Sequence, residues 1–97
     1  MKAASAIGKI TGLVLSAGIY EEKLLENTTD EEMEHFFSVN VFGAMKLTRE
    51  AIPAMRGAAG SIVAVASDAA LQGNVQCSLY GATKGALVSF IRSLALE

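Results

Sequence analysis

Hydrophobic residues along this chain form two patterns, short unbroken runs and longer stretches with three- and four-residue spacing. The runs Leu13 to Leu15 and Ile62 to Ala66 show no alternation with polar residues. Such runs are typical of strands that are buried on both faces of a parallel sheet. We therefore expect one strand over residues 13–15 and another over residues 61–66, each covered on both faces.

The stretch between these runs predicts a long helix. Thr29 followed by Glu32 matches a capping box, and the negative charges of Asp30 and Glu31 in the first turn interact favourably with the helix dipole. The helix is expected to run to about Arg56, with Pro53 bending or loosening its last turns. Its apolar residues recur mostly every three or four positions: Met33, Phe36, Phe37, Phe42, Met45, Leu47, Ile52 and Met55.

A second helix is expected over residues 79–96, and residues 3–7 read as the last turns of a helix that ends at Gly8. The connection over residues 68–77 contains Gly73 and Asn74, which predict its turn. The order strand, helix, strand, helix predicts an α/β unit with a right-handed parallel crossover. The apolar stripe of the second helix comprises Leu87, Phe90, Ile91 and Leu94.

Two parallel strands do not make a self-sufficient sheet. Each strand would leave unpaired backbone groups along its outer edge, and such edges have to be covered or paired. The pattern therefore indicates either pairing with another copy or a longer natural protein.

Composition limits the chain to one small domain over residues 1–97. The net charge of −2 gives no basic surface for nucleic acid, and no apolar run approaches the length of a membrane span or of a signal peptide. Cys77 is the only cysteine, which fits a reducing compartment and favours a packing role over a nucleophilic one. We expect a cytoplasmic protein with no metal site.

Candidate chemistry is concentrated near the carboxyl ends of the predicted strands. Tyr80 and Lys84 are four residues apart, so they share one helix face, and the lysine charge would lower the pKa of Tyr80 from its usual value near 10. Ser67 ends the second strand and could reach the same point. Asn40 lies among apolar residues, where a bend in the helix would let it hold a water molecule. Each of these features alone also has an explanation without chemistry. Tyr80 and Lys84 could be a chance pair on a helix surface, Ser67 a strand-end cap, and Asn40 an isolated polar residue in a helix.

At these residues the chain resembles the classical short-chain dehydrogenase/reductase family. Tyr80-Gly-Ala-Thr-Lys84 is similar to the family's Tyr-x-x-x-Lys element, and Ser67 precedes the tyrosine by thirteen residues. Asn40, within Ser-Val-Asn-Val-Phe-Gly, precedes Ser67 by twenty-seven. The resemblance covers essentially the whole chain. It implies a partial Rossmann-like unit that lacks the N-terminal dinucleotide-binding half.

The resemblance implies a catalytic tetrad. Tyr80 would exchange a proton with the substrate's carbonyl or hydroxyl oxygen, and Ser67 would hydrogen-bond that oxygen. Lys84 would lower the pKa of the tyrosine and bind the nicotinamide ribose, while Asn40 would fix a water molecule. NAD or NADP would carry the hydride.

Cofactor contacts are also implied for Ser16, Ala17 and Gly18, together with the tyrosine and the lysine. The family's Asn-Asn-Ala-Gly reads Leu15-Ser16-Ala17-Gly18 here, so two amide side chains are replaced. The glycine-rich turn that takes the cofactor's pyrophosphate is absent from the chain. We therefore expect little cofactor binding or turnover by the chain alone.

Three hypotheses follow from the sequence. The chain could be the catalytic middle of an oxidoreductase that interconverts a hydroxyl and a carbonyl, recorded as a fragment. It could instead be a self-associating module, a homo-oligomer joined through the two long helices, in which Ala82, Ala86, Ser89 and Ser93 allow close helix contact. Lastly, it could be half of a split enzyme whose glycine-rich part is a separate, complementing chain.

Overall fold

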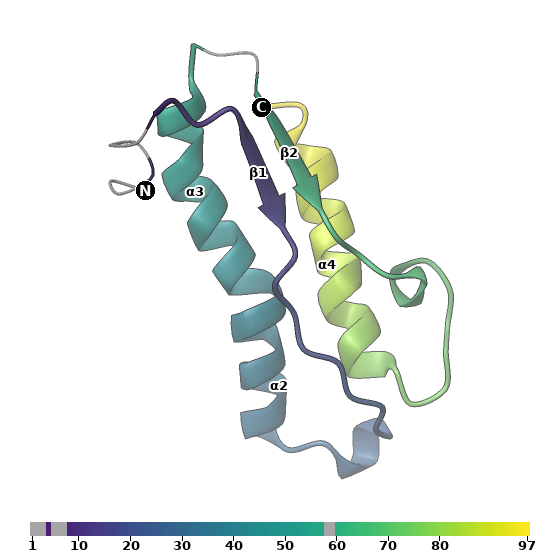
Figure 1. Cartoon of the computed structure of the whole chain (residues 1–97). Helices are drawn as coiled ribbons and strands as arrows, with labels where there is room; N and C mark the ends of the chain where they lie inside the picture. Colours follow the sequence, from purple (N-terminus) through teal and green to yellow (C-terminus); the bar gives the residue numbers. More distant parts are fainter. Residues whose placement is uncertain (1–3, 5–7, 58–59) are drawn as a thin grey trace.

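The structure is a computed structural model that describes residues 4, 8–57 and 60–97. Apart from Ala4, the helix end expected over residues 3–7 lies outside the described residues. The elements follow one another as β1 (Gly12–Leu15), the 3₁₀-helix η1 (Leu25–Asn27), α2 (Asp30–Phe37), the π-helix η2 (Ser38–Phe42), α3 (Gly43–Met55), β2 (Ser61–Ala64), the 3₁₀-helix η3 (Asp68–Ala70) and α4 (Ser78–Leu94) (Figure 1).

This order confirms the α/β unit expected from the sequence. The two strands pair in parallel, with Gly12 opposite Ser61 and Leu15 opposite Ala64. The second strand ends two residues earlier than expected, although the Val65 amide still donates to the Leu15 carbonyl at 2.9 Å.

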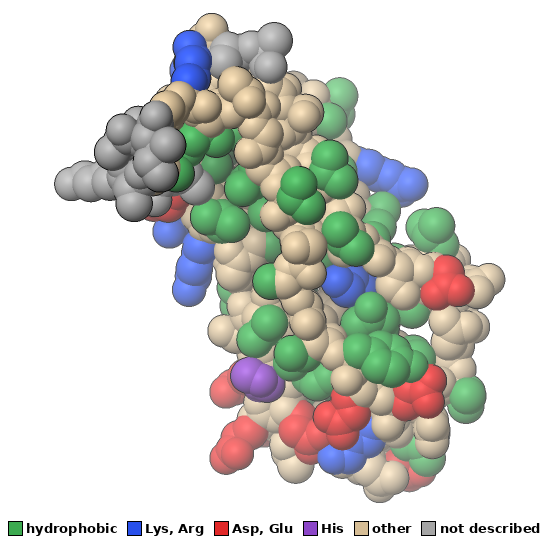
Figure 2. All heavy atoms as spheres, viewed as in Figure 1, with side chains coloured by type: hydrophobic (Ala, Val, Ile, Leu, Met, Phe, Trp, Pro, Cys, Tyr) green, Lys and Arg blue, Asp and Glu red, His purple; other side chains and the backbone are tan. Residues whose placement is uncertain are grey.

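Only one face of the sheet is covered. α3 packs against β1 and α4 against β2, so Leu15 is 5% exposed, whereas Val14 is 61% and Val63 is 54% exposed. The expectation that both faces are buried is therefore wrong for this chain, because no described element crosses the second face. Figure 2 shows hydrophobic side chains at the surface over the strands. We call the exposed Val14, Val63 and Val65 the open sheet face.

The predicted long helix is a succession of three helical segments, α2, η2 and α3. Phe36 and Val41 are buried along its inner side, and so are Ala51 and Met55 nearer its end. Pro53 lies inside α3, which ends two residues later at Met55, one residue before the predicted end. The π-helical segment η2 was not predicted.

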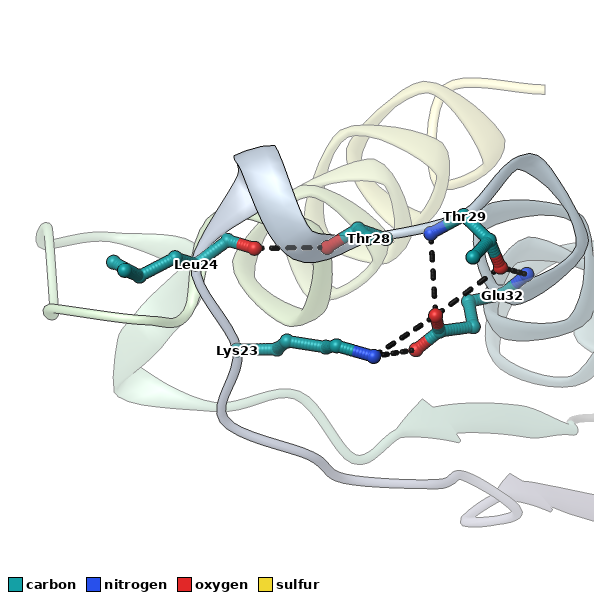
Figure 3. A network of polar contacts seen from close by, with 5 residues as sticks. All are labelled: Lys23, Leu24, Thr28, Thr29 and Glu32. Carbon is teal, nitrogen blue, oxygen red and sulfur yellow. Dashed lines mark hydrogen bonds and ion pairs between the residues drawn. The ribbon is translucent and has the colours of Figure 1, made fainter.

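The start of α2 is tied to the preceding segment by a polar network (Figure 3). The Thr29 hydroxyl accepts from the Glu32 amide at 3.1 Å, and the Glu32 carboxylate accepts from the Thr29 amide at 3.2 Å, which confirms the capping box. Lys23 Nζ donates to both oxygens of Glu32, at 2.9 and 2.8 Å. These bonds from Lys23 and from the cap lower the pKa of Glu32.

The connection between β2 and α4 turns later than expected. The Cys77 amide donates to the Asn74 carbonyl at 3.2 Å, so Val75 and Gln76 occupy the middle of the turn. Gln76 has a φ of 62°, a left-handed conformation that is uncommon outside glycine. Its carbonyl accepts from the Lys23 amide at 2.8 Å, which attaches the turn to the segment that follows β1.

Cys77 is buried, as expected of a packing residue. Within the described part of the chain, none of the helices has the length and apolar character needed to cross a bilayer.

Candidate functional site

The site lies beyond the carboxyl ends of the two parallel strands. Ser16, Ala17 and Gly18 follow β1 and are exposed, and Ser67 follows β2. Tyr80 and Lys84 lie in the first two turns of α4. Open α/β sheets bind their ligands at this end of the strands.

Asn40 holds three of these segments together from the centre of η2. The π-helical turn directs its side chain inward, where it has no exposed surface. Its Oδ1 accepts from the Ile19 amide at 2.8 Å, and its Nδ2 donates to the Ile19 carbonyl at 3.0 Å and to Thr83 Oγ1 at 3.1 Å. The side chain therefore clamps the segment after β1 against α4.

Thr83 continues this network within α4. Its hydroxyl accepts from Asn40 and donates to the Tyr80 carbonyl at 2.7 Å. Threonine bonding to a preceding carbonyl satisfies a buried hydroxyl without a second side chain. The first turn of α4, which carries Tyr80, is thus connected to Asn40 through one residue.

Lys84 is buried beside this clamp and is only 5% exposed. Its Nζ donates to the Val65 carbonyl at 3.2 Å. Among the described residues no carboxylate forms an ion pair with Lys84. Burial without an opposite charge lowers the pKa of this lysine.

Gly18 leaves the space in which Lys84 ends. A Cβ at this position would lie 3.1 Å from Lys84 Nζ and 3.4 Å from Asn40 Oδ1. The first distance is tighter than ordinary van der Waals contact and the second is at its lower limit, so a methyl group here would press on the end of the lysine side chain. The small residue that follows β1 therefore gives Lys84 Nζ the room that it occupies.

Tyr80 lies between a cation and a second aromatic ring. Lys84 Nζ is 5.8 Å from the centre of the Tyr80 ring, and the ring of Tyr20 meets it edge to face at a centroid distance of 4.8 Å. The Tyr20 hydroxyl donates to Glu22 at 2.5 Å, and this bond raises the pKa of Tyr20. Tyr20 therefore stays protonated and packs against Tyr80 as a neutral ring.

Ser67 is engaged locally rather than with the tyrosine. Its hydroxyl accepts from the Ala69 amide at 3.2 Å and donates to Asp68 at 3.3 Å, which makes Ser67 the cap of η3. No hydrogen bond joins Ser67 to Tyr80 in the described structure. A Cβ at Gly81 would lie 2.8 Å from the Ala69 carbonyl, so η3 packs closely on α4 at that glycine.

Of the predicted site residues, the structure places Asn40 Oδ1 and Lys84 Nζ beside Gly18, and it places Tyr80 beside the lysine. Sequence reasoning missed Thr83 and Tyr20. Thr83 lies within the Tyr80 to Lys84 element, where its position between two candidate residues was the available signal. Tyr20 directly follows Ile19, whose backbone Asn40 clamps.

Comparison with known proteins identifies the family. The sequence model of the protein family described as short chain dehydrogenase matches residues 1–97. The chain belongs to the short-chain dehydrogenase family. Related family members include the 3-oxoacyl-[acyl-carrier-protein] reductase of Mus musculus, 44% identical over 91 residues, and carbonyl reductase family member 4 of Xenopus laevis, 38% identical over 92 residues. Each match covers 94% of this chain and 39% of the relative.

Solved structures of the family share the fold. The crystal structure of the KRED1-Pglu enzyme matches with a TM-score of 0.91 and 31% identity, covering 98% of this chain and 40% of that one. A short chain dehydrogenase from Burkholderia cenocepacia in complex with NADP matches with a TM-score of 0.84 and 32% identity, covering 97% of this chain and 38% of that one. This chain therefore spans about two fifths of the length of these family members.

Proposed function

We propose that the chain is the catalytic middle of an NAD(P)-dependent oxidoreductase that interconverts a hydroxyl and a carbonyl. The observation that carries the proposal is the convergence of Asn40, Lys84 and Gly18 next to Tyr80, at the strand ends where this fold binds ligands. Membership of the short-chain dehydrogenase family supports the same chemistry.

In this proposal Tyr80 passes a proton to the substrate oxygen during reduction and takes it back during oxidation. Lys84 Nζ lies 5.8 Å from the centre of the phenol ring, where its charge would stabilise the negative charge that develops on the tyrosine oxygen as the proton moves. Ser67 hydrogen-bonds the same oxygen after its hydroxyl leaves Asp68. Asn40 acts through the clamp on Ile19 and through Thr83, since its side-chain atoms are already bonded to protein.

The residues at the strand ends fit the ribose end of a nicotinamide cofactor. Ser16, Ala17 and Gly18 are exposed, and Lys84 Nζ lies beneath Gly18 with N–H donors beyond the one bonded to Val65. Lys84 would donate to the ribose hydroxyls and Ala17 and Gly18 would allow close approach. When bound, the cofactor supplies the hydride. Cytoplasmic location remains part of this proposal.

The proposal includes little or no turnover by the chain alone, because it lacks a glycine-rich phosphate-binding turn. Titration of NADH and NADPH against the purified chain, followed by cofactor fluorescence, measures this directly. Weak or absent binding is expected. Micromolar binding with carbonyl-dependent oxidation of the cofactor would overturn the expected inactivity.

The catalytic residues are tested in a chimera. The matching segment of the Mus musculus reductase is replaced by this chain, and oxidation of NADH or NADPH is followed with a 3-oxoacyl thioester. Activity is expected in the chimera, with a loss of about 100-fold or more in kcat for Tyr80→Phe. Tyr20→Phe is the matched control, because it keeps the ring against Tyr80 and is expected to retain most activity. A folded chimera whose Tyr80→Phe variant remains fully active would refute the assignment.

A second candidate function, self-association, is favoured by the exposed apolar surface. The accessible area of 6421 Å² exceeds by about a fifth the roughly 5300 Å² expected for a compact monomer of this mass. The open sheet face contributes to this excess, and so do Phe42, Met45 and Leu47 on the long helix, which are 49%, 41% and 42% exposed. On α4, the small residues Ala82, Ser89 and Ser93 are also exposed.

Light scattering at micromolar concentration distinguishes a self-associated chain from a folded monomer. A dimer or larger oligomer is expected if the exposed helical surfaces associate, and a folded monomer would count against the self-associating module.

A third candidate, the split enzyme, predicts that a separate chain with a glycine-rich strand and helix restores cofactor binding on mixing. If no such chain restores cofactor binding on mixing, and the matching N-terminal part of the murine relative also does not, the result would count against the split-enzyme hypothesis.

A further inference from the structure

The backbone of Tyr80 is held by hydrogen bonds, but its phenol ring is not. The Tyr80 carbonyl accepts from the Thr83 hydroxyl at 2.7 Å, and the amide of the next residue, Gly81, donates to the Cys77 carbonyl at 2.7 Å. Within the described part of the chain, the hydrogen bonds at Tyr80 involve its backbone and leave its hydroxyl free for a substrate. The orientation of the ring therefore depends on two side-chain torsions and on the groups that the ring contacts.

Two groups contact the ring of Tyr80. One is Lys84 Nζ, 5.8 Å from the centre of the ring and on the same helix. The other is the ring of Tyr20, at a centroid distance of 4.8 Å and an interplanar angle of 89°, which is a preferred geometry for aromatic pairs. Of these two contacts, only the one with Tyr20 comes from a different segment of the chain.

The segment that carries Tyr20 is anchored on both sides of this residue. Asn40 bonds the amide of Ile19 at 2.8 Å and its carbonyl at 3.0 Å. Further along, the Lys23 amide donates to the Gln76 carbonyl at 2.8 Å. The backbone around Tyr20 is therefore fixed against the rest of the site, and it can present the ring at a defined place.

The Tyr20 side chain contributes little to the core. It is 60% exposed, so burial does not explain an aromatic ring at this position. Its hydroxyl donates to Glu22, and this bond is the main cause that raises the pKa of Tyr20, so the phenol stays neutral. The feature that remains for Tyr20 to provide is the edge-to-face contact with Tyr80.

We propose that Tyr20 is a positioning residue for Tyr80. Its ring holds the Tyr80 phenol in the orientation from which the proton passes to the substrate oxygen. The effect on rate rests on the proposed oxidoreductase function, whereas the contact between the two rings does not. Because the Tyr20 ring acts on Tyr80 and not on the substrate, its loss should lower kcat and leave KM nearly unchanged.

Two substitutions separate the ring of Tyr20 from its hydroxyl in the chimera with the murine reductase. Tyr20→Leu keeps an apolar side chain but removes the ring, and kcat is expected to fall about two- to tenfold, the bias that one edge-to-face pair supplies. Tyr20→Phe keeps the ring and should restore kcat close to the original value. Leu25→Ala, at a 55% exposed position of η1 away from the site, is the matched control and should leave both constants unchanged.

Three kinetic results would overturn the proposal. Unchanged kcat in Tyr20→Leu would mean that the ring has no effect on the proton transfer. A higher KM with unchanged kcat would mean that Tyr20 contacts the substrate instead. Equal losses in Tyr20→Leu and Tyr20→Phe would assign the effect to the hydroxyl and not to the ring.

A measurement on the chain itself tests the contact without turnover. The chain contains two tyrosines and no tryptophan, so the tyrosine ring signals are readily assigned by NMR. The nuclear Overhauser contact between the Tyr80 ring and the Lys84 side chain should persist in Tyr20→Phe and weaken in Tyr20→Leu, with folding confirmed by circular dichroism. An unchanged contact in folded Tyr20→Leu would refute the positioning role even if the chimera is active. A weakened contact combined with an inactive chimera would support the positioning of the ring and refute the proposed oxidoreductase function.

Discussion

Replacing Asn40 with alanine tests the clamp that organises the site. The substitution removes a side chain with no exposed surface and takes from the Ile19 amide, the Ile19 carbonyl and the Thr83 hydroxyl the bond that each makes to Asn40. The backbone of η2 can stay helical, because alanine is a good helix former. The perturbation is therefore the loss of three specific bonds, together with a cavity where the amide group was.

The magnitude follows from those bonds. Each contributes about 1 kcal/mol net, which gives a loss of roughly 3 kcal/mol in the free energy of unfolding. Ile19 is half-buried, so water can replace part of what is lost there. For a chain of this size, roughly 3 kcal/mol corresponds to a decrease in Tm of about 12–24 °C.

Two measurements together check the reasoning. Urea unfolding followed by circular dichroism gives the change in stability, and hydrogen exchange gives the protection of the Ile19 amide, which donates to Asn40 at 2.8 Å. In Asn40→Ala this amide should exchange faster than neighbouring helical amides that keep their bonds. Asn27→Ala, at an exposed position of η1, is the matched control and should change stability by less than about 0.5 kcal/mol.

The clamp would be refuted by either of two results. Stability in Asn40→Ala could stay within about 0.5 kcal/mol of the original chain. Alternatively, stability could fall while the Ile19 amide keeps its protection, which would mean that the loss comes from a cavity and not from the released segment.

Three further predictions concern other parts of the fold. The pKa of Glu32 is lowered in the folded chain, so its stabilising effect is present above its unfolded pKa and is lost as the pH falls below about 4. Glu32→Gln should therefore make the free energy of unfolding depend less steeply on pH in this range. Gly81→Ala should cost about 1–3 kcal/mol in urea unfolding, because its Cβ would lie 2.8 Å from the Ala69 carbonyl. Gly85→Ala, with 3.9 Å to the nearest such atom, should be neutral or stabilising by up to about 1 kcal/mol, and equal losses at both glycines would contradict this packing. Val63→Thr keeps the β-branched shape on the open sheet face and should lower the scattering mass if that face associates, whereas an unchanged mass would exclude it.

The sequence predicted the elements whose signals are local. The capping box at Thr29 and Glu32 fixed the start of α2, and unbroken apolar runs located both strands. Tyr80 and Lys84 were placed together because four residues make about one helical turn. These inferences need only neighbouring residues along the chain.

Features that depend on contacts between distant segments could not be predicted. The π-helical turn at Asn40 has no distinctive residue composition, and its partner is the backbone of Ile19, which carries no sequence signal. The apolar runs indicated burial on both faces, yet Val14 and Val63 are exposed. The hydrophobic pattern shows which faces of a strand can be buried, but it does not show whether this chain provides an element that covers them. The turn near Gln76 is likewise set by the distant Lys23 amide.

The π-helical turn also makes the site depend on the number of residues in the chain. The Gly43 amide bonds to the Ser38 carbonyl, five residues back instead of the four of an α-helix. Five residues therefore fill the turn that four fill in an α-helix, and the extra residue widens the backbone where Asn40 lies. Deleting one residue between Ser38 and Gly43 would restore a regular ladder and leave α2 and α3 in nearly the same relative orientation, because the wide turn had absorbed that residue. Asn40 itself would shift within its turn and lose its alignment with Ile19 and Thr83. A deletion that the helix tolerates would therefore still break the clamp.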